Sequence, residues 1–298
     1  MKNHLFILLF LIPYSFIAQE SNKSNMDNMF DKIDNATKKK LDSAVSIEYY
    51  NKSMKIYNYQ EKILMLDTAI MWSSRVSRYY LMRGVAKEMS KDNAAAIIDY
   101  TNAIRLDQNY VVAYSNRAYL YKKMANYNAS IKDYDIILAM KDHQHGHNYK
   151  KRGEVKELNE NFKGAIEDYN KAIKLDPEDG YLYYYRGTLK VRLGDFYGSL
   201  SDLNKALSKD ENINPKDLWT IYYFKGLSLL FRKADGDLEE AIIAFNKSIN
   251  YKETSKAFSM RAKCHLGLGN KIKACDDLSK SGELGNMSAY DEMKIHCR

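Results

Sequence analysis

The sequence predicts an all-α protein built as a solenoid of about seven antiparallel helix pairs. Three observations lead to this prediction. Four columns of similar residues recur along the chain with a period of about 34 residues. Within one period the apolar residues follow helical spacing, as do Ala96, Ile97, Tyr100 and Ala103. The 298 residues include only three prolines and fourteen glycines, which argues against a loop-rich β sandwich.

The amino-terminal residues 1–18 are predicted to be a secretory signal peptide. A short basic start precedes an unbroken apolar run at residues 5–12, and cleavage is expected after Ala18. Phe16 is larger than the residue usually preferred near a cleavage site, so an uncleaved membrane anchor is the alternative. The apolar stretch is short for a bilayer span. We therefore expect the mature protein to be exported, either to the periplasm or as a secreted protein.

A polar, flexible lead-in is predicted for residues 19–42, with a turn to helix after Asp34. The repeats follow at residues 43–288. Their expected starts lie near residues 43, 77, 111, 146, 180, 219 and 255. Residues 289–298 are expected to form a tail or a capping helix.

The four columns define one repeat. Each repeat has a basic residue followed by a small one, then a second small residue, a large apolar residue and a further small or apolar one. The basic and small pairs are Arg83 and Gly84, Arg117 and Ala118, Arg152 and Gly153, Arg186 and Gly187, Lys225 and Gly226, and Arg261 and Ala262. A single helix hairpin of this size cannot bury its apolar face alone, so the hairpins must stack on one another.

The copy with the fullest pattern is AIEDYNKAIKLDP at residues 165–177, and it resembles the tetratricopeptide repeat. The resemblance covers residues 43–288. It implies a right-handed superhelical solenoid whose first helices line a concave groove, and a role in holding protein or peptide partners. The chain departs from the family because Tyr or Phe stands where the first helix usually carries Trp.

Each repeat arginine has a matching aspartate sixteen residues later, which predicts an ion-pair ladder along the solenoid. The expected pairs are Arg83 and Asp99, Arg117 and Asp133, Arg152 and Asp168, Arg186 and Asp202, and Arg261 and Asp277. The sixth repeat changes both positions, to Lys225 and Ala244. Five copies of one active site make no sense, so these residues are predicted to be structural.

The resemblance places ten residues in the partner-binding groove. They are Leu81, Asn116, Tyr119, Lys123, Lys150, Lys151, Tyr181, Tyr184, Tyr223 and Leu227. Tyrosines beside lysines suit a peptide with acidic groups; alternatively, several of these tyrosines pack against neighbouring helices. The family's carboxylate clamp for chaperone tails is disfavoured, because Leu81 stands at a position where that clamp needs lysine.

No motif for catalysis is present, so the protein is predicted to be a non-enzyme without cofactor or metal. His143, His145 and His147 alternate in a loop, which is better interpreted as a polar connection than as a metal site. Two interpretations remain open for the cysteines. Cys264 and Cys275 are equally far from the turn between the last two repeat helices, which would allow a disulfide; otherwise all three cysteines are reduced.

The formal charge of +8 leaves a second functional class open. Lysines and tyrosines on one surface would also suit a nucleic-acid-binding solenoid. The export signal and the interleaving of basic and acidic residues argue against it. A protein-interaction scaffold remains the favoured hypothesis.

Overall fold

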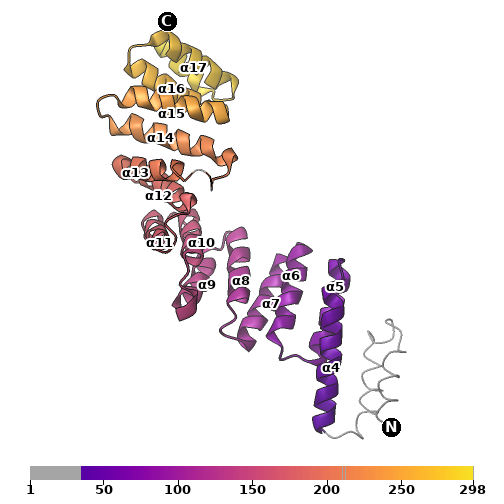
Figure 1. The fold of residues 1–298 in the computed structure, drawn as a ribbon. Coiled ribbons are helices and arrows are strands. Elements are labelled where there is room, and N and C mark those ends of the chain that lie inside the picture. Colours follow the sequence, from indigo (N-terminus) through magenta and orange to yellow (C-terminus); the bar gives the residue numbers. More distant parts are fainter. Residues whose placement is uncertain (1–34, 210, 212, 298) are drawn as a thin grey trace. The chain divides into compact units, whose positions relative to one another are not determined.

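The computed structural model describes residues 35–209, 211 and 213–297 (Figure 1). The predicted signal peptide and residues 19–34 of the predicted lead-in lie outside the described residues. Every regular element within the described ranges is a helix, so the fold is all-α. None of these helices combines the length and the apolar character that a membrane span requires.

The chain divides into two compact units, and the boundary in the sequence lies between Ala125 and Asn126. The first unit contains two helix pairs, α4 with α5 and α6 with α7, and then α8, which packs on α7. The bounds are α4 Asn35–Met54, α5 Tyr59–Trp72, α6 Ser77–Met89, α7 Asn93–Leu106 and α8 Val111–Lys123. Residues 35–42 of the expected lead-in therefore belong to helix α4.

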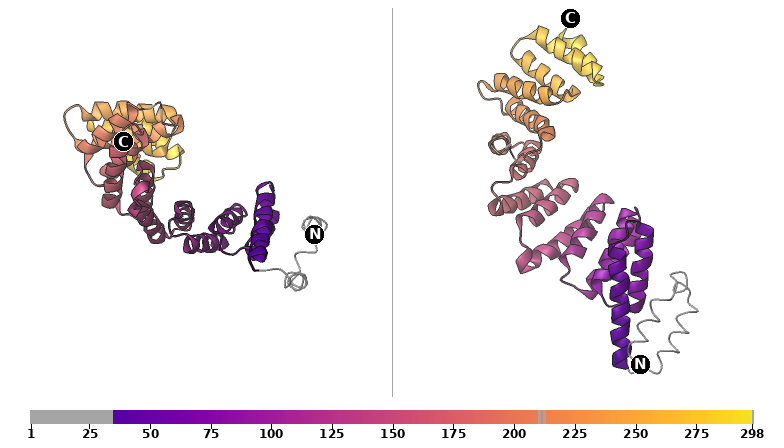
Figure 2. Two further views of the ribbon diagram at one scale, coloured as in Figure 1. Left: turned by 60° about the horizontal axis from the view of Figure 1, so that its bottom comes forward. Right: turned by 45° about the vertical axis from the view of Figure 1, so that its right-hand side comes forward.

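The second unit begins with α9 and continues with four helix pairs, α10 with α11 through α16 with α17, followed by α18. Figures 1 and 2 show the pairs stacked in chain order. The bounds are α9 Tyr127–Ala139, α10 Gly146–Leu158, α11 Phe162–Leu175, α12 Gly180–Arg192, α13 Phe196–Leu207, α14 Leu218–Arg232, α15 Asp237–Tyr251, α16 Ser255–Gly267, α17 Lys271–Glu283 and α18 Ser288–His296. Short 3₁₀ helices precede α10 (η1, Lys141–His143) and α14 (η3, Pro215–Asp217).

The second helix of most repeats starts with the same local structure. An Asp or Asn at the N-cap accepts a hydrogen bond from the backbone N–H three residues further on, which satisfies one of the free donors of the first turn. The capping residues are Asp92, Asn126, Asn161, Asp195 and Asn270. The residue before each cap has a positive φ, yet it is glycine only at Gly194 and Gly269.

The column of small residues is required by close packing between the two helices of a pair. A Cβ atom at Gly153 would lie 2.8 Å from Cε1 of Tyr169, and one at Gly226 would lie 2.6 Å from Cε1 of Phe245. Both rings are fully buried. Because protein interiors are close-packed, neither glycine can be enlarged without displacing the ring that fills the space beside it.

Both interpretations of the cysteines, a Cys264–Cys275 disulfide and three reduced thiols, are wrong. Cys275 instead bonds to Cys297, with 5.8 Å between their Cα atoms, and Cys264 is a buried free thiol. Cys264 packs into a cluster with Leu229 and Phe245 of the preceding repeat. Equal distance from a turn gives two residues the same height on adjacent helices. Their rotation about the helix axes then turns Cys264 toward the preceding repeat and Cys275 toward the carboxyl-terminal end.

Helix α18 covers the apolar end of the last helix pair. Ala289 is fully buried and Met293 partly buried against Ala274 and Leu278 of α17. The disulfide at Cys297 adds a covalent link between the end of α18 and α17. Helix α18 thereby buries apolar surface of the seventh helix pair, as stacking on a neighbouring repeat does for the other pairs.

Candidate partner-binding surface

The predicted groove residues of the first unit differ in their exposure. Leu81 of α6 is only 6% exposed, so this prediction is corrected: Leu81 is a core residue. Asn116 of α8 is partly buried. Tyr119 is 47% exposed and its ring centroid lies 5.8 Å from the ammonium of Lys122. Lys123 is exposed.

In the second unit, three tyrosines of α12 form one aromatic cluster with Tyr169 of α11. The ring centroids of Tyr184 and Tyr185 are 5.2 Å apart, those of Tyr169 and Tyr185 5.7 Å, and those of Tyr181 and Tyr185 6.0 Å. These separations are typical of favourable aromatic pairs. Tyr181, Tyr184 and Tyr185 all remain partly exposed. We call these three residues and Tyr169 the tyrosine cluster.

Lys150 of α10 lies over the tyrosine cluster. Its ammonium is 5.3 Å from the ring centroid of Tyr181 and 5.6 Å from that of Tyr185, within the range of a cation–π interaction. The same ammonium is 2.8 Å from Oδ2 of Asp179. Of the two lysines expected beside these tyrosines, Lys150 is therefore in place. Lys151 instead pairs with Glu154 of its own helix at 3.1 Å.

Two further carboxylates border the cluster. The hydroxyl of Tyr181 donates to Oδ2 of Asp217 at 2.8 Å, and the hydroxyl of Tyr169 donates to Oε2 of Glu157 at 3.3 Å. Within the described residues, no Lys or Arg forms an ion pair with Asp217 or Glu157. Burial raises the pKa of the Glu157 carboxyl above its ordinary value, and the hydrogen bond from Tyr169 partly opposes this.

The tyrosine cluster is also part of the packing between repeats. Tyr181 and Tyr184 contact a buried group that includes Leu218 and Ile221 of α14. Burial raises the pKa of the Tyr184 hydroxyl. Tyr184 is therefore partly exposed and at the same time packs against the next repeat.

Helix α14 continues the apolar surface. Tyr223 packs its ring 5.6 Å from that of Phe224 and 6.0 Å from that of Phe245, and burial raises the pKa of its hydroxyl. Leu227, one turn further along, is partly buried against the same group. Both predicted residues keep partial exposure.

Four of the predicted ladder pairs lie within a single unit, and all four are formed. In each pair the arginine donates two hydrogen bonds of 2.5 to 2.9 Å to the two carboxylate oxygens of its aspartate, a bidentate arrangement. The pairs are Arg83 with Asp99, Arg152 with Asp168, Arg186 with Asp202, and Arg261 with Asp277. Arg117 belongs to the first unit and donates to Thr101 at 2.9 Å, and Asp133 is a buried residue of the second unit.

Each of these arginines also reaches back to the second helix of the preceding repeat, which the sequence analysis missed. Arg186, for example, donates to Oδ1 of Asn170 at 2.6 Å. The equivalent acceptors are Asp67 for Arg83, Asp135 for Arg152 and Asn246 for Arg261. The signal was available: a polar residue with a side-chain acceptor directly follows the large apolar column, as Asn170 follows Tyr169.

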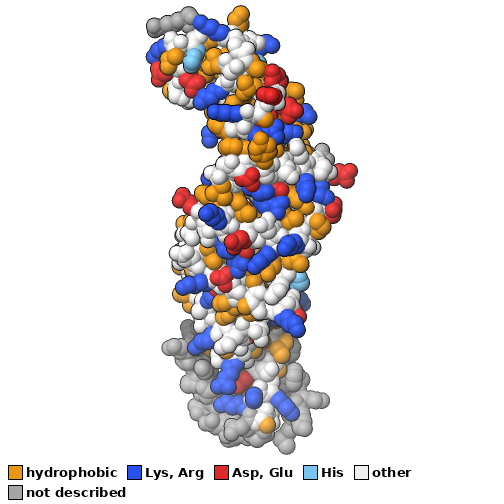
Figure 3. Space-filling model, turned by 90° about the vertical axis from the view of Figure 1, so that its left-hand side faces the viewer, with side chains coloured by type: hydrophobic (Ala, Val, Ile, Leu, Met, Phe, Trp, Pro, Cys, Tyr) orange, Lys and Arg blue, Asp and Glu red, His pale blue; other side chains and the backbone are white. Residues whose placement is uncertain are grey.

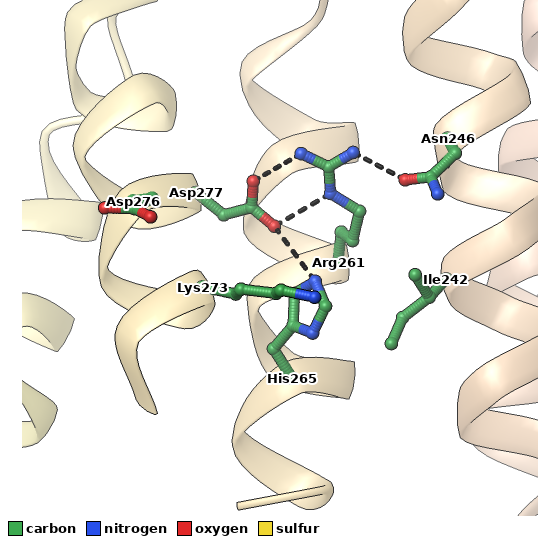
Figure 4. A pocket seen from close by; sticks show the side chains of 7 residues that line it. All are labelled: Ile242, Asn246, Arg261, His265, Lys273, Asp276 and Asp277. Atoms are coloured by element: carbon green, nitrogen blue, oxygen red, sulfur yellow. Dashed lines mark hydrogen bonds and ion pairs between the residues drawn. The ribbon is translucent and has the colours of Figure 1, made fainter. Parts of the chain in front are cut away.

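A lysine one turn after the arginine completes the set. Lys87, Lys156 and Lys190 each place their ammonium 2.8 Å from the second oxygen of the ladder aspartate. In the last repeat this position is His265, whose Nε2 is 3.9 Å from Oδ2 of Asp277. Here an open cavity of about 310 Å³ lies beside the pair (Figure 4). Burial lowers the pKa of His265.

No cluster of three or more His, Cys, Asp or Glu side chains within the described residues is arranged to hold a metal ion. The rings of His143 and His145 meet edge to face with their centroids 6.1 Å apart. His147 is exposed at the start of α10.

Comparison with known proteins supports one family. The profile described as "TPR repeat" matches residues 158–194, and no curated protein sequence matches the chain. A tetratricopeptide repeat protein from Parabacteroides merdae is similar in structure with a TM-score of 0.57 at 18% identity, over 86% of this chain and 100% of that one.

Two further solved structures are similar at low identity. YrrB, described as a TPR protein with an unusual peptide-binding site, has a TM-score of 0.55 at 24% identity over 65% of this chain and 97% of its own. The MamA protein has a TM-score of 0.53 at 19% identity over 60% of this chain and 93% of its own. With the recurring columns and the stacked helix pairs, these similarities lead to one conclusion: the chain has the fold of tetratricopeptide repeat proteins, and its residues 158–194 match the repeat itself.

Proposed function

We propose that the protein is a non-catalytic scaffold that binds a peptide or protein segment on the first helices α10, α12 and α14. The observation behind this proposal is the tyrosine cluster, whose partly exposed rings continue into Tyr223 and Leu227 of α14. Large aromatic side chains on a firm support are frequent binding hot spots. The similarity to YrrB, which carries a peptide-binding site, agrees with this class of function.

The contacts of the lysines change the expected chemistry of the partner. Lys150 is paired with Asp179 and Lys151 with Glu154. An acidic group of a partner would have to displace one of these carboxylates. The proposed surface therefore relies on aromatic and apolar contacts, and acidic groups of a partner are not needed for binding.

The proposed setting is the cell envelope or the exterior of the cell. The predicted signal peptide at residues 1–18 and the Cys275–Cys297 disulfide both suit an oxidising compartment. Mass determination of the native mature protein tests the proposal, and an amino terminus at or near Gln19 is expected. An intact Met1 on a cytoplasmic protein would overturn it.

The function is tested by the Tyr184→Ala variant as bait in quantitative capture of the native partner. We expect capture to fall at least tenfold, since truncation of an aromatic hot spot typically costs about 2 kcal/mol or more of binding. Tyr197→Ala is the matched control, because Tyr197 of α13 is 69% exposed and lies outside the tyrosine cluster. Its capture should equal that of the wild type.

Folding must be followed in both variants, because Tyr184 also packs on the neighbouring repeat. Circular dichroism and the melting temperature separate lost binding from lost packing. If Tyr184→Phe, which keeps the ring, also keeps full capture, the ring is the binding element. Unchanged capture with Tyr184→Ala would place the binding surface elsewhere.

Nucleic acid is the less supported alternative. On the face shown in Figure 3, basic and acidic side chains are interleaved with apolar ones, and no broad area is uniformly basic. Binding to phosphates weakens steeply with salt because bound counterions are released. A salt series on any nucleic acid that copurifies with the protein would reveal that mode of binding.

A further inference from the structure

The tyrosine cluster already holds one cation, and that cation belongs to the chain itself. The ammonium of Lys150 lies over the rings of Tyr181 and Tyr185 and is neutralised by Asp179 at 2.8 Å. Aromatic faces and a carboxylate together therefore form a site for an alkylammonium group. A second site on the same surface has the same kinds of group, aromatic rings and carboxylates.

The second place surrounds Tyr184. Its ring centroid lies 6.5 Å from that of Tyr181 and 5.2 Å from that of Tyr185, and no Lys or Arg of the described residues lies over its own face. Asp217 and Glu157 are the carboxylates whose charges act on the Tyr184 hydroxyl, and both raise its pKa. Each accepts a tyrosine hydroxyl, and neither is in an ion pair with a residue of the described chain.

The surrounding cations are committed elsewhere. Lys150 and Lys151 pair with Asp179 and Glu154. Arg192 acts on the Glu157 carboxylate from a longer range, while its guanidinium lies over the ring of Phe162 at 5.5 Å. The place around Tyr184 thus combines an aromatic face with two carboxylates that lack a cationic partner.

We propose that this place receives a lysine or arginine side chain of the bound partner, so that the scaffold selects a basic segment rather than an acidic one. The inference rests on the proposed function and names the chemistry of its partner. The cation would lie against Tyr184 between Asp217 and Glu157, as Lys150 lies against Tyr181 beside Asp179. The apolar side chains of Tyr223 and Leu227 on α14 would contact the neighbouring residues of the segment.

The two carboxylates around Tyr184 favour a basic peptide, whereas the net charge of the whole chain favours an acidic one. The two effects therefore predict opposite preferences, which a binding experiment can distinguish. The formal charge of +8 attracts acidic peptides at long range. We would measure fluorescence anisotropy of three synthetic dodecapeptide pools with the same apolar content on the full chain. One pool carries three Arg or Lys residues, one three Glu residues and one three Gln residues. We expect the basic pool to bind at least tenfold more tightly than the acidic pool.

The Glu157→Gln, Asp217→Asn double variant locates the effect. Both replacements keep an oxygen that accepts the tyrosine hydroxyl, so the packing should persist. The basic pool should lose at least fivefold in affinity while the glutamine pool is unchanged. Asp291→Asn with Glu292→Gln on α18 is the matched control, which removes two carboxylates far along the chain and should change nothing.

Three results would overturn the inference: equal or tighter binding of the acidic pool, an unchanged preference in the Glu157 and Asp217 double variant, or no binding of the basic pool up to millimolar concentration. Tyr184→Ala distinguishes this failure from that of the proposed function. If Tyr184→Ala lowers the affinity for all three pools equally and peptide charge has no effect, the proposed binding surface is supported. Only the proposed selectivity for basic segments is then wrong.

Discussion

The fifth and sixth repeats pack side by side in the same unit, yet they hold their helices together differently. In the fifth, Asp202 is almost completely buried and receives Arg186 and Lys190, and Arg186 also contacts Asn170 of the fourth repeat. In the sixth, the equivalent positions are Lys225 and Ala244, so the buried carboxylate is missing.

The sixth repeat has its ion pair at another place. Arg232 at the end of α14 is bonded through two nitrogens to Asp237, which is 2% exposed and also accepts the backbone N–H of Ala234 at 2.7 Å. This pair fixes the enlarged turn between α14 and α15 rather than the middle of the helices. In both repeats a buried carboxylate links the two helices, but it does so at different positions.

The largest effect is expected for Asp202→Ala in the fifth repeat. The change leaves the charges of Arg186 and Lys190 uncompensated at a largely buried site, which should lower the free energy of unfolding by about 3 to 5 kcal/mol. Urea unfolding followed by circular dichroism measures it. The control Asp291→Ala removes an exposed carboxylate paired with Lys294 and should cost at most about 0.5 kcal/mol. Equal losses in the two variants would contradict a structural role for the ladder.

A smaller loss, about 1 to 3 kcal/mol, is expected for Asp237→Asn in the sixth repeat. The hydrogen bond from Arg232 holds the pKa of the Asp237 carboxyl below its ordinary value. The stabilisation is therefore present at neutral pH and is lost as the pH falls through the lowered pKa, below about pH 4. Unfolding at pH 7 and pH 3 should show the variant and the wild type converging in acid. A constant difference would exclude the charge as the cause.

Lys225→Met should raise the free energy of unfolding by about 1 kcal/mol. Burial lowers the pKa of the Lys225 ammonium, Glu240 opposes this only in part, and no ladder carboxylate is present. The same replacement in the fifth repeat, Arg186→Met, should have the opposite sign, because it leaves Asp202 without its arginine. Thermal and urea unfolding of both variants measures the pair. A loss of stability in Lys225→Met would show that the sixth repeat uses its lysine as the others use arginine.

The smallest effect concerns the seventh repeat, where His265 replaces the ladder lysine. His265→Lys should add about 0.5 kcal/mol at pH 7.5, since a lysine there can approach Asp277 as Lys190 approaches Asp202.

The pH dependence checks this last assignment. Burial and the charges of Arg261 and Lys273 lower the pKa of His265, and Asp277 raises it to a lesser extent than burial lowers it. The folded state therefore binds the proton less readily than the unfolded state, and the wild type loses stability as the pH falls below the ordinary value of about 6.5. The advantage of the variant should grow between pH 7.5 and pH 5.5. An equal advantage at both values would contradict the assignment.

The repeat pattern was readable because it depends on size and spacing. Gly153 and Tyr169 fit each other sterically, so their types recur in a fixed register along the chain. The ladder could be predicted for the same reason, since each arginine and its aspartate keep a separation of sixteen. The turns were less visible, because Lys91 and Glu160 adopt the positive φ that the sequence signals only through Gly194 and Gly269.

The predictions that failed depended on side-chain direction. Leu81 lies on a first helix, as a groove residue should, but its side chain points into the core. Cys264 and Cys275 have the same height on adjacent helices and face opposite neighbours. Counting residues along a helix gives position along the axis, whereas the pairing of Lys151 with Glu154 and of Lys150 with Asp179 also depends on rotamers and on the neighbouring repeat.

Because each ladder arginine contacts the second helices of two successive repeats, its interaction energy is shared between nearest neighbours. If one repeat opens, the arginine of the following repeat loses an acceptor, so opening becomes less favourable for single repeats than for longer segments. The sixth repeat has lysine at this position. Its main ion pair instead joins Arg232 to Asp237 across the turn between its own two helices. The junction before α14 therefore lacks the arginine that couples the other repeats. It is held instead by the packing of Tyr181 and Tyr184 on α14 and by the hydrogen bond from Tyr181 to Asp217.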